Sequence, residues 1–168
     1  MYEEMSVDSP LSQGDVIEGC PLFVLEDMNG IADVTVSPLR WQSRIVVLSQ
    51  ACDLVHGKTM RVVVAPVHSA LILVDRGILK ASVIRDQIRR GTVFGWYFLP
   101  TAPEPFVLPE SVVDLRDLHT VSRTVLERLI ADGQRICHIK TPYREHLAQH
   151  FAVTYMRIGL PEPYETES

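Results

Sequence analysis

The sequence lacks the cysteine pattern of a disulfide-stabilised or zinc-binding protein. Its three cysteines, Cys20, Cys52 and Cys137, are far apart, odd in number and without a CxxC pair. Structural disulfides need pairs, and cysteine zinc sites need closely spaced ligands. We therefore expect three reduced thiols and a cytoplasmic protein.

The chain also lacks a long apolar run. No stretch approaches the about 18 consecutive apolar residues of a membrane-spanning helix. Its acidic, polar start, MYEEMSVDSPLSQGD, is typical of neither a signal peptide nor a transit peptide. We expect residues 1–13 to be a flexible lead and 161–168 a flexible tail. Residues 14–160 then form one domain, which is long enough to bury a core without metals or disulfides.

Phosphate-binding loops are missing too, since neither GxxxxGK nor GxGxxG occurs. Their absence argues against P-loop NTPases and dinucleotide-dependent enzymes, and we expect no cofactor. The formal net charge of -5 disfavours binding of the whole molecule to nucleic acid or to anionic membranes. Any contact with nucleic acid then needs a local basic patch.

One basic concentration is present in the middle of the chain. Its candidates for nucleic-acid binding are Arg85, Arg89 and Arg90. Arg85 and Arg89 are one helical turn apart and can contact phosphates together. The alternative is an ordinary solvated helix face, because Asp75 and Asp86 dilute the charge.

What the chain does contain is the pattern of a mainly β protein with added helices, of the α+β class. The apolar runs RIVVLSQ (44–50) and MRVVVAPV (60–67) indicate two central strands buried on both faces. Apolar spacing and capping residues predict helices over 78–90, 123–131 and 142–158. The other predicted strands cover 15–27, 31–39, 92–100, 111–115 and 135–140. This order of elements indicates a small β-barrel with an inserted helix and a C-terminal helix.

The first central strand ends in a group of polar residues: Ser49, Gln50, Cys52, Asp53 and His56. A strand end that meets a loop is where folds place functional groups. Cys52 is a candidate nucleophile beside Asp53, with His56, His68 or His119 as the base that forms its thiolate. The alternative is that Cys52 is a small buried hydrophobe and Asp53 caps the following turn. Ser49 and Gln50 then bond only to loop backbone.

Metal ligands are a weaker possibility. His146 and His150 lie four residues apart on the last predicted helix, but EHLAQH lacks the HExxH arrangement that supplies a catalytic base. A solvated flank of an amphipathic helix is the interpretation that we favour for them. We expect no metal site.

With these segments placed, the chain resembles the MazF/PemK-like toxins, small SH3-like barrels that cut single-stranded RNA. A GD dipeptide at residues 14 and 15 leads into the first strand, as it does in that family. RIVVLS (44–49) is similar to their apolar strand that begins with Arg-Pro and ends in Ser, with Ile45 in place of the proline. VVVAPVHSA (62–70) is similar to their strand ending in Pro-x-Thr-Ser. The segment SVVDLRDLHTVSRTVLERL (111–129) is similar to a later strand followed by a short helix.

The resemblance implies RNA binding and metal-independent endoribonuclease activity. Carried over to this sequence, the catalytic positions of that family fall on Arg44 and on His68 with Ser69. Cleavage through a 2′,3′-cyclic phosphate needs a base for the 2′-hydroxyl, an acid for the leaving oxygen and a cation for the phosphorane charge. His68 or His119 would transfer protons, and Arg44 would hold the phosphate.

Other interpretations remain open. In one, Arg44 pairs with a surface acid such as Asp33 or Glu26, and His68 is a satisfied residue at a strand end. A second is a non-catalytic interaction module that docks a partner through the barrel and the helix 142–158. A third is a thiol enzyme centred on Cys52. The expected partners are accordingly single-stranded RNA, a protein partner or antitoxin, or a second copy in a homodimer.

Overall fold

The apolar runs RIVVLSQ and MRVVVAPV form two neighbouring strands in the middle of the sheet. β3 (Leu39–Val47) and β4 (Arg61–Ser69) pair antiparallel. Successive side chains of a strand point to opposite faces. Ile45 and Val47 lie in one buried cluster, whereas Val46 lies in another. Both faces of β3 are therefore covered, which confirms the prediction of central strands.

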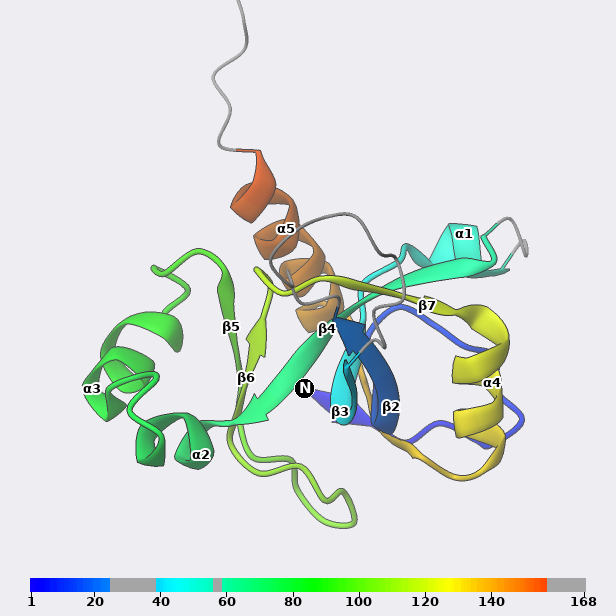
Figure 1. Cartoon of the computed structure of the whole chain (residues 1–168), viewed down its shortest axis with the longest axis horizontal. Helices are drawn as coiled ribbons and strands as arrows, with labels where there is room; N and C mark the ends of the chain where they lie inside the picture. Colours follow the sequence, from blue (N-terminus) through cyan, green and yellow to red (C-terminus); the bar gives the residue numbers. More distant parts are fainter. Residues whose placement is uncertain (25–38, 56–58, 157–168) are drawn as a thin grey trace, which may run out of the picture.

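The remaining strands extend this pair into one large sheet. They are β1 (Tyr2–Glu3), β2 (Asp15–Val24), β5 (Trp96–Leu99), β6 (Ser111–Asp114), β7 (His119–Ser122) and β8 (Arg135–Ile139). The computed structural model describes residues 1–24, 39–55 and 59–156, which form an α+β fold with an eight-stranded antiparallel sheet. The strand order is β1-β8-β2-β3-β4-β6-β5, and β7 pairs with β4 (Figure 1). Within these ranges no pairing joins the end strands β1 and β5, so closure into a barrel stays a prediction.

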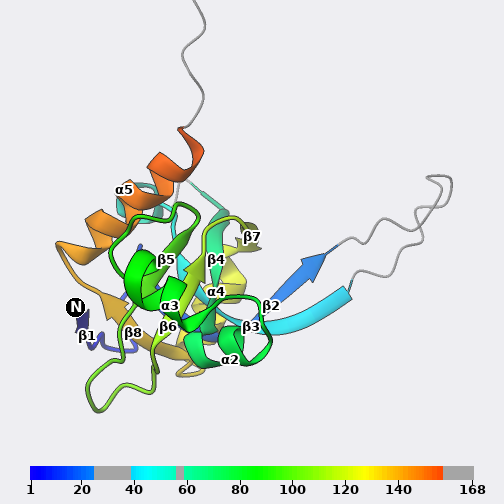
Figure 2. The ribbon, with the colours of Figure 1, turned by 90° about the vertical axis from the view of Figure 1, so that its left-hand side faces the viewer.

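Short helical segments accompany the sheet. They are α1 (Ala51–Val55), α2 (Ala70–Asp75), α3 (Ala81–Val83), its π-helical continuation η1 (Ile84–Ile88), α4 (Arg123–Ala131) and α5 (Tyr143–Tyr155). α2, α3 and η1 lie together on the side of β5 and β6, while α4 and α5 lie elsewhere (Figures 1 and 2). No helix in the described ranges is long and apolar enough to cross a membrane.

Each helix group covers its own part of the core. Ile84 and Ile88 of η1 pack with Val112 of β6. Leu126 of α4 joins the cluster on one face of β3, and Leu147 of α5 joins the cluster on the other face. All five side chains are buried. Burial of a side chain of this size stabilises a fold by about 1.5–3 kcal/mol. Because α4 and α5 contribute such side chains to clusters on opposite faces of β3, helices stabilise the sheet from both sides.

Several predicted elements are confirmed. α4 has the predicted limits, and β6, β8 and α5 lie within the ranges predicted for them. β2 carries the predicted bulge, seen as a register shift between Ile17 and Cys20 at Gly19, whose φ is 69°. The prediction of a strand over 31–39 falls almost entirely outside the described residues.

Other elements differ from the prediction. The strand predicted over 92–100 is confined to β5, because Gly95 with a φ of 86° turns the chain just before it. The helix predicted over 78–90 is the shorter α3 with η1, which ends at Ile88 and is followed by a turn that includes Gly91 with its positive φ of 69°. α1, α2, β1 and β7 were not predicted. Each is short, so it carries little periodic signal.

The first residues of the chain, predicted to be a flexible lead, contact the sheet. Tyr2 pairs with Ile139 of β8, and its hydroxyl donates a hydrogen bond of 2.6 Å to the carbonyl of Pro100. Leu11 is also buried. The two contacts of Tyr2 join residues far apart in the sequence, which a local pattern does not report. The predicted tail over 161–168 lies outside the described residues.

Candidate active site

Two of the predicted catalytic histidines lie on the same strand ladder. β4 pairs with β6 at one end, where His68 is opposite Val112, and with β7 at the other end, where Val64 is opposite His119. Side chains opposite each other in a ladder point to the same face, and His68 and Val64 are four residues apart on β4. His68 and His119 therefore project to one face, on either side of the turn between β6 and β7.

That turn supplies acidic neighbours to both rings. The Nε2 atom of His119 lies 3.0 Å from a carboxylate oxygen of Asp117. The angle at this contact is not that of a hydrogen bond, so the two groups form a close ion-pair contact only. Burial lowers the pKa of His68 from its ordinary value of 6.5, and the carboxylates of Asp114 and Asp117 partly oppose that effect. Asp117 thus acts on both histidines. We call His68, Asp114, Asp117 and His119 the histidine–aspartate cluster.

Arginines border the cluster. The guanidinium of Arg116 forms two hydrogen bonds of 2.9 Å with the Asp114 carboxylate. It also lies 3.9 Å from the centre of the Trp96 ring, a cation–π contact. Arg76, at the end of α2, is exposed and close enough to His68 to lower its pKa. No ion pair of Arg76 occurs among the described residues, so its charge is available to an anion.

Aromatic side chains also border the cluster. The ring of Trp41 contacts His119 edge-on, with 5.8 Å between ring centres, and its side chain is 37% exposed. Beside His119 is a shallow hollow of about 260 Å³, which is also lined by Leu22, Phe23 and Leu118. An exposed aromatic beside a titratable ring is a surface on which a planar base can stack.

Arg44 is not brought together with His68. Residues an even number apart on a strand point to the same face, so Arg44 points to the face of Val46 on β3, and His68 points to the face of Val64 on β4. These two valines lie in different buried clusters on opposite faces of the sheet. The Arg44 guanidinium pairs with Glu18 of β2, with its Nη2 2.6 Å from a carboxylate oxygen. Asp33 and Glu26, the partners considered from the sequence, lie outside the described residues.

Ser69 ends β4 and precedes α2. Its side chain makes no capping hydrogen bond to that helix. It lines an apolar groove of about 370 Å³ together with Leu71, Val74, Ile84 and Pro109. Ser69 is thus directed toward the α2 side of the molecule, next to His68 in sequence but in an apolar setting.

The polar group after β3 has a mainly structural arrangement. The hydroxyl of Ser49 accepts a hydrogen bond of 2.8 Å from the backbone N–H of Val63, and the carbonyl of Gln50 accepts one from the N–H of Asp53. The Ser49 side chain thus bonds to the backbone of strand β4 and not of a loop, whereas the side chain of Gln50 contacts Cys52. Cys52 is exposed, so the interpretation that it is a buried hydrophobe is wrong. Its Sγ lies 3.6 Å from Gln50 Oε1 and 3.9 Å from an Asp53 oxygen.

A base for Cys52 is not evident. Both of its polar neighbours, Gln50 Oε1 and the Asp53 carboxylate, are hydrogen-bond acceptors, and neither is a histidine. His56, the nearest histidine in sequence, lies outside the described residues. The cluster after β3 therefore contributes no catalytic geometry within the described part of the chain.

The three basic candidates of the middle segment have different surroundings. Arg85 forms two hydrogen bonds with the neighbouring Asp86, which neutralises it. Arg89 lies 5.9 Å from the centre of the Phe98 ring, and Arg90 is exposed. Phe98, Val112 and His68 are opposite one another across β5, β6 and β4. At about 4.8 Å per strand, this row places Phe98 about 10 Å from His68.

The two histidines of α5 have partners other than a metal ion. His146 Nδ1 lies 3.1 Å from the hydroxyl of Tyr97, and the His150 ring is buried beside Tyr97 and Phe94. The prediction that they form a solvated flank is therefore wrong for His150. Within the described ranges, no group of three or more His, Cys, Asp or Glu is arranged to hold a metal ion.

The sequence reasoning missed most of the charged neighbours of His68 and His119. Asp114, Arg116 and Asp117 are absent from the predicted site, although DLRDLH begins at the end of the strand predicted over 111–115 and ends in His119. That concentration of charge at a strand end is a usable signal. Arg76 carries no such signal, because only the fold of α2 brings it beside His68.

Comparison of the chain with protein-family models finds no match, and comparison with curated proteins finds none either.

Proposed function

We propose that this protein binds single-stranded RNA and cleaves it without a metal ion, using His68 and His119 for proton transfer. The observation that carries the proposal is the position of Asp117, which contacts His119 and acts electrostatically on His68 across one face of the sheet. A carboxylate that contacts one imidazole and acts electrostatically on the second, with a cation at the border, accompanies the groups that phosphodiester cleavage needs.

The chemistry divides between the two rings. Burial favours the neutral form of His68, so it acts as the base that takes the proton of the 2′-hydroxyl. The 2′ oxygen bonds to phosphorus, and the bond from phosphorus to the 5′ oxygen breaks. His119 donates a proton to that leaving oxygen. The products are a 2′,3′-cyclic phosphate and a 5′-hydroxyl, so the step needs no water, oxidant or cofactor.

Substrate binding is assigned to groups at the border of the cluster. Arg76 is the cation for the developing phosphorane charge, in place of Arg44, which is paired with Glu18 on the other face. Trp41 offers a surface on which a base can stack, and Arg89 and Arg90 offer contacts to a neighbouring phosphate. These local groups are needed because the whole chain has a net charge of -5.

The proposal includes the SH3-like barrel expected from the resemblance. β4 supports it, because one of its edges pairs with β3 while the other pairs with both β6 and β7. A strand that pairs with two different strands along one edge is a place where a sheet can turn a corner, and such corners are needed for closure.

The deciding experiment is cleavage of mixed-sequence single-stranded RNA in EDTA, with the product ends mapped. We expect cyclic phosphate ends, and a fall of ~100-fold or more in rate for His68→Gln and for His119→Gln, the usual scale for acid–base catalysis. Arg76→Gln should also slow the reaction. Arg44→Gln is the matched control, an arginine on the other face, and should leave the rate nearly unchanged.

Two results would overturn this function. The first is intact RNA with the folded wild-type chain, and the second is a rate that falls for Arg44→Gln but not for the histidine variants. Circular dichroism of each variant separates loss of chemistry from loss of folding. Cleavage that EDTA abolishes would point to metal-dependent chemistry and would equally contradict the proposal.

A second candidate function is an interaction module. α2 exposes Leu71 and Ile72, with exposed fractions of 68% and 48%, beside the apolar groove lined by Ser69, Val74 and Pro109. Exposed apolar side chains beside a groove are typical of a surface that binds another chain. An antitoxin-like protein or a second copy would fit there. Light scattering of the wild type and of Leu71→Glu tests the homodimer, which predicts a dimer that the variant dissociates.

The C-terminal helix contributes less to such a surface than the sequence suggested. Leu147 is buried, and Phe151 packs against the core of the same molecule. Tyr155 and Met156 are exposed. Part of the apolar face of α5 is therefore used inside the chain itself.

A further inference from the structure

A pocket of about 290 Å³ is lined by β5, by the end of η1 and by the start of α5. Four of its lining residues carry rings: Tyr97 and Phe98 of β5, and Tyr143 and His146 of α5. Since a cavity of about 150 Å³ accommodates a benzene ring, this pocket has room for a larger planar group such as a nucleobase. It shares no residue with the histidine–aspartate cluster.

The ring of His146 is held by a contact with Tyr97. The Tyr97 hydroxyl lies 3.1 Å from His146 Nδ1, whereas its contact with the carbonyl of Tyr143 is longer, at 3.4 Å. We assign the hydroxyl as the donor to Nδ1. A neutral imidazole that accepts a hydrogen bond at Nδ1 carries its proton on Nε2. No hydrogen bond of Nε2 occurs in the described part of the chain, so this N–H is free to donate to a ligand.

Arg89 supplies a positive charge to the same pocket. It is exposed, and its guanidinium carbon lies 5.9 Å from the centre of the Phe98 ring. Arg90 is exposed beside it. Neither arginine forms an ion pair among the described residues. Two adjacent unpaired arginines fit successive phosphates of one strand better than a single carboxylate.

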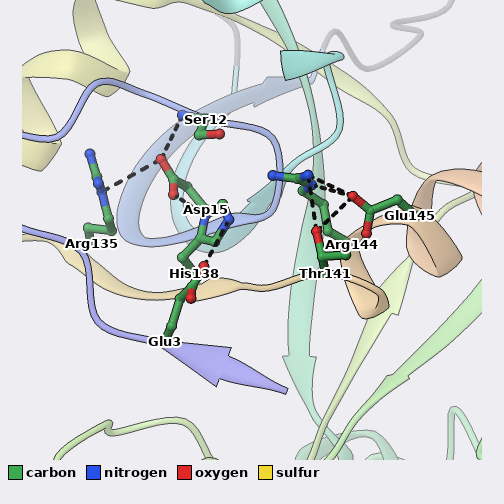
Figure 3. A network of polar contacts seen from close by, with 8 residues as sticks. All are labelled: Glu3, Ser12, Asp15, Arg135, His138, Thr141, Arg144 and Glu145. Carbon is green, nitrogen blue, oxygen red and sulfur yellow. Dashed lines mark hydrogen bonds and ion pairs between the residues drawn. The ribbon is translucent and has the colours of Figure 1, made fainter. Parts of the chain in front are cut away.

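The acidic residues near the pocket in sequence are already paired. Among the described residues, none that lines the pocket is acidic. Glu145, next to His146, lies 2.6 Å from Nη2 of Arg144 at the start of α5 (Figure 3). Asp86 pairs in the same way with Arg85. The local charge therefore favours an anionic ligand over a cationic one.

We propose that this pocket binds one nucleotide of a single-stranded RNA, with the base stacked on Tyr143 and the phosphate on Arg89. Tyr143 is 43% exposed, so one face of its ring is accessible, and every nucleobase has a face that stacks on an aromatic ring. The edge of the base accepts a hydrogen bond from Nε2 of His146. The guanidinium binds phosphate oxygens with charge-assisted hydrogen bonds.

The source of the nucleotide rests on the proposed function, because a free mononucleotide has the same chemistry. Phe98, beside Arg89, belongs to the cross-strand row that also contains His68. The bound nucleotide is therefore a neighbour of the cleaved one. None of the lining residues lies in the segments that are similar to the toxins, so the resemblance does not imply this subsite.

The first test is titration of the full ¹⁵N-labelled chain with adenosine 5′-monophosphate, followed by NMR. We expect saturable shifts at the amides of Arg89, Phe98 and His146. Adenosine, which lacks the phosphate, should bind at least ~10-fold more weakly, because it loses the charge-assisted bonds. Inorganic phosphate, which lacks the base, should also bind more weakly. Equal affinity for adenosine and the monophosphate would overturn the role of Arg89.

Variants of exposed residues keep the test separate from folding. Arg89→Gln should weaken binding of the monophosphate ~10-fold, whereas Arg128→Gln, an exposed arginine of α4, is the matched control and should not change it. Tyr143→Ala should weaken binding ~10-fold through loss of stacking. Tyr143→Phe keeps the ring and should bind as the wild type does. Unchanged affinity in Arg89→Gln or Tyr143→Ala would contradict the proposal.

A short 2′-O-methyl RNA oligonucleotide tests the source of the nucleotide, because its blocked 2′ oxygen prevents cleavage. It should bind at least ~10-fold more tightly than the monophosphate, since linked contacts act together. Equal affinity would make the ligand a free mononucleotide and overturn the assignment to a strand. Cleavage of RNA by a chain that shows no monophosphate shifts would overturn the pocket alone. Tight oligonucleotide binding with these shifts but without cleavage of ordinary RNA would support the pocket and overturn the proposed function.

Discussion

The imidazole Nε2 of His119 lies 3.0 Å from the carboxylate of Asp117, and that same carboxylate raises the pKa of His68 against the larger effect of burial. One acidic side chain in a short turn therefore links two histidines that belong to different strands. The link depends on β4, which pairs with both β6 and β7.

Asp117→Asn should slow RNA cleavage by less than removal of either histidine. The amide keeps the size of the side chain but removes the charge that acts on both rings, so the pH profile of kcat/KM should shift as well. A merely structural role for Asp117 would leave that profile in place. Asp86→Asn, which removes a carboxylate on the exposed η1 segment, is the matched control.

The pair of Arg44 and Glu18 should contribute modestly to stability and nothing to cleavage. The side chains of Arg44 and Glu18 are 20% and 43% exposed, so the pair is partly screened by solvent and we expect a coupling energy of about 1 kcal/mol or less. A double-mutant cycle with Arg44→Gln and Glu18→Gln, measured by urea unfolding, gives that value. A coupling energy well above about 1 kcal/mol would contradict this prediction, because it would mean that solvent screens the ion pair only weakly.

The unfolding free energy should fall as the pH drops below about 6.5. Burial lowers the pKa of His68 and of His150, so the unfolded chain binds protons at a higher pH than the folded chain does. Stability is then complete above the unfolded value and declines as the pH falls through the lower, folded values. Urea unfolding from pH 7.5 to pH 5.5 measures the decline, which should be shallower in His150→Gln. Parallel curves for the two proteins would contradict this assignment.

Iodoacetamide should alkylate Cys52 in the native protein much faster than the other two cysteines. Cys52 is exposed, whereas burial raises the pKa of Cys20 to about 11 and that of Cys137 to about 12. Thiolate is the reactive form, so the buried thiols have both low access and little thiolate. Peptide mapping after timed alkylation measures the three rates. All three should become similar in urea, which serves as the control for reagent and detection.

Gly95→Ala should destabilise the protein more than Gly77→Ala does. Both glycines have positive φ, 86° and 68°, so each substitution carries a backbone cost of about 1–2 kcal/mol. A Cβ at Gly95 would in addition lie 2.7 Å from Cγ of Arg116, whereas nothing lies within 4 Å at Gly77. Thermal unfolding compares the two. Equal losses would show that Arg116 moves aside freely, despite its contacts with Asp114 and Trp96.

The sequence by itself determined the elements that bury many apolar residues in a regular pattern. The runs around Val46 and Val64 predicted central strands, and the apolar spacing around Leu126 predicted α4 with its correct limits. A long periodic pattern reports local structure because burial of one face or of both faces constrains every residue in it. Short elements such as α2 and β7 carry too few residues for such a pattern.

Only the tertiary structure decided which polar residues meet. The spacing of Arg44 and His68 within their motifs gave no sign that they lie on opposite faces, because the face depends on the register between β3 and β4. In the same way, α2 brings Arg76 near enough to His68 for its charge to act on that ring, and β1 and β8 meet at Asp15 and Arg135 (Figure 3). These contacts join distant parts of the chain, so they follow from the packing of the sheet and not from local sequence.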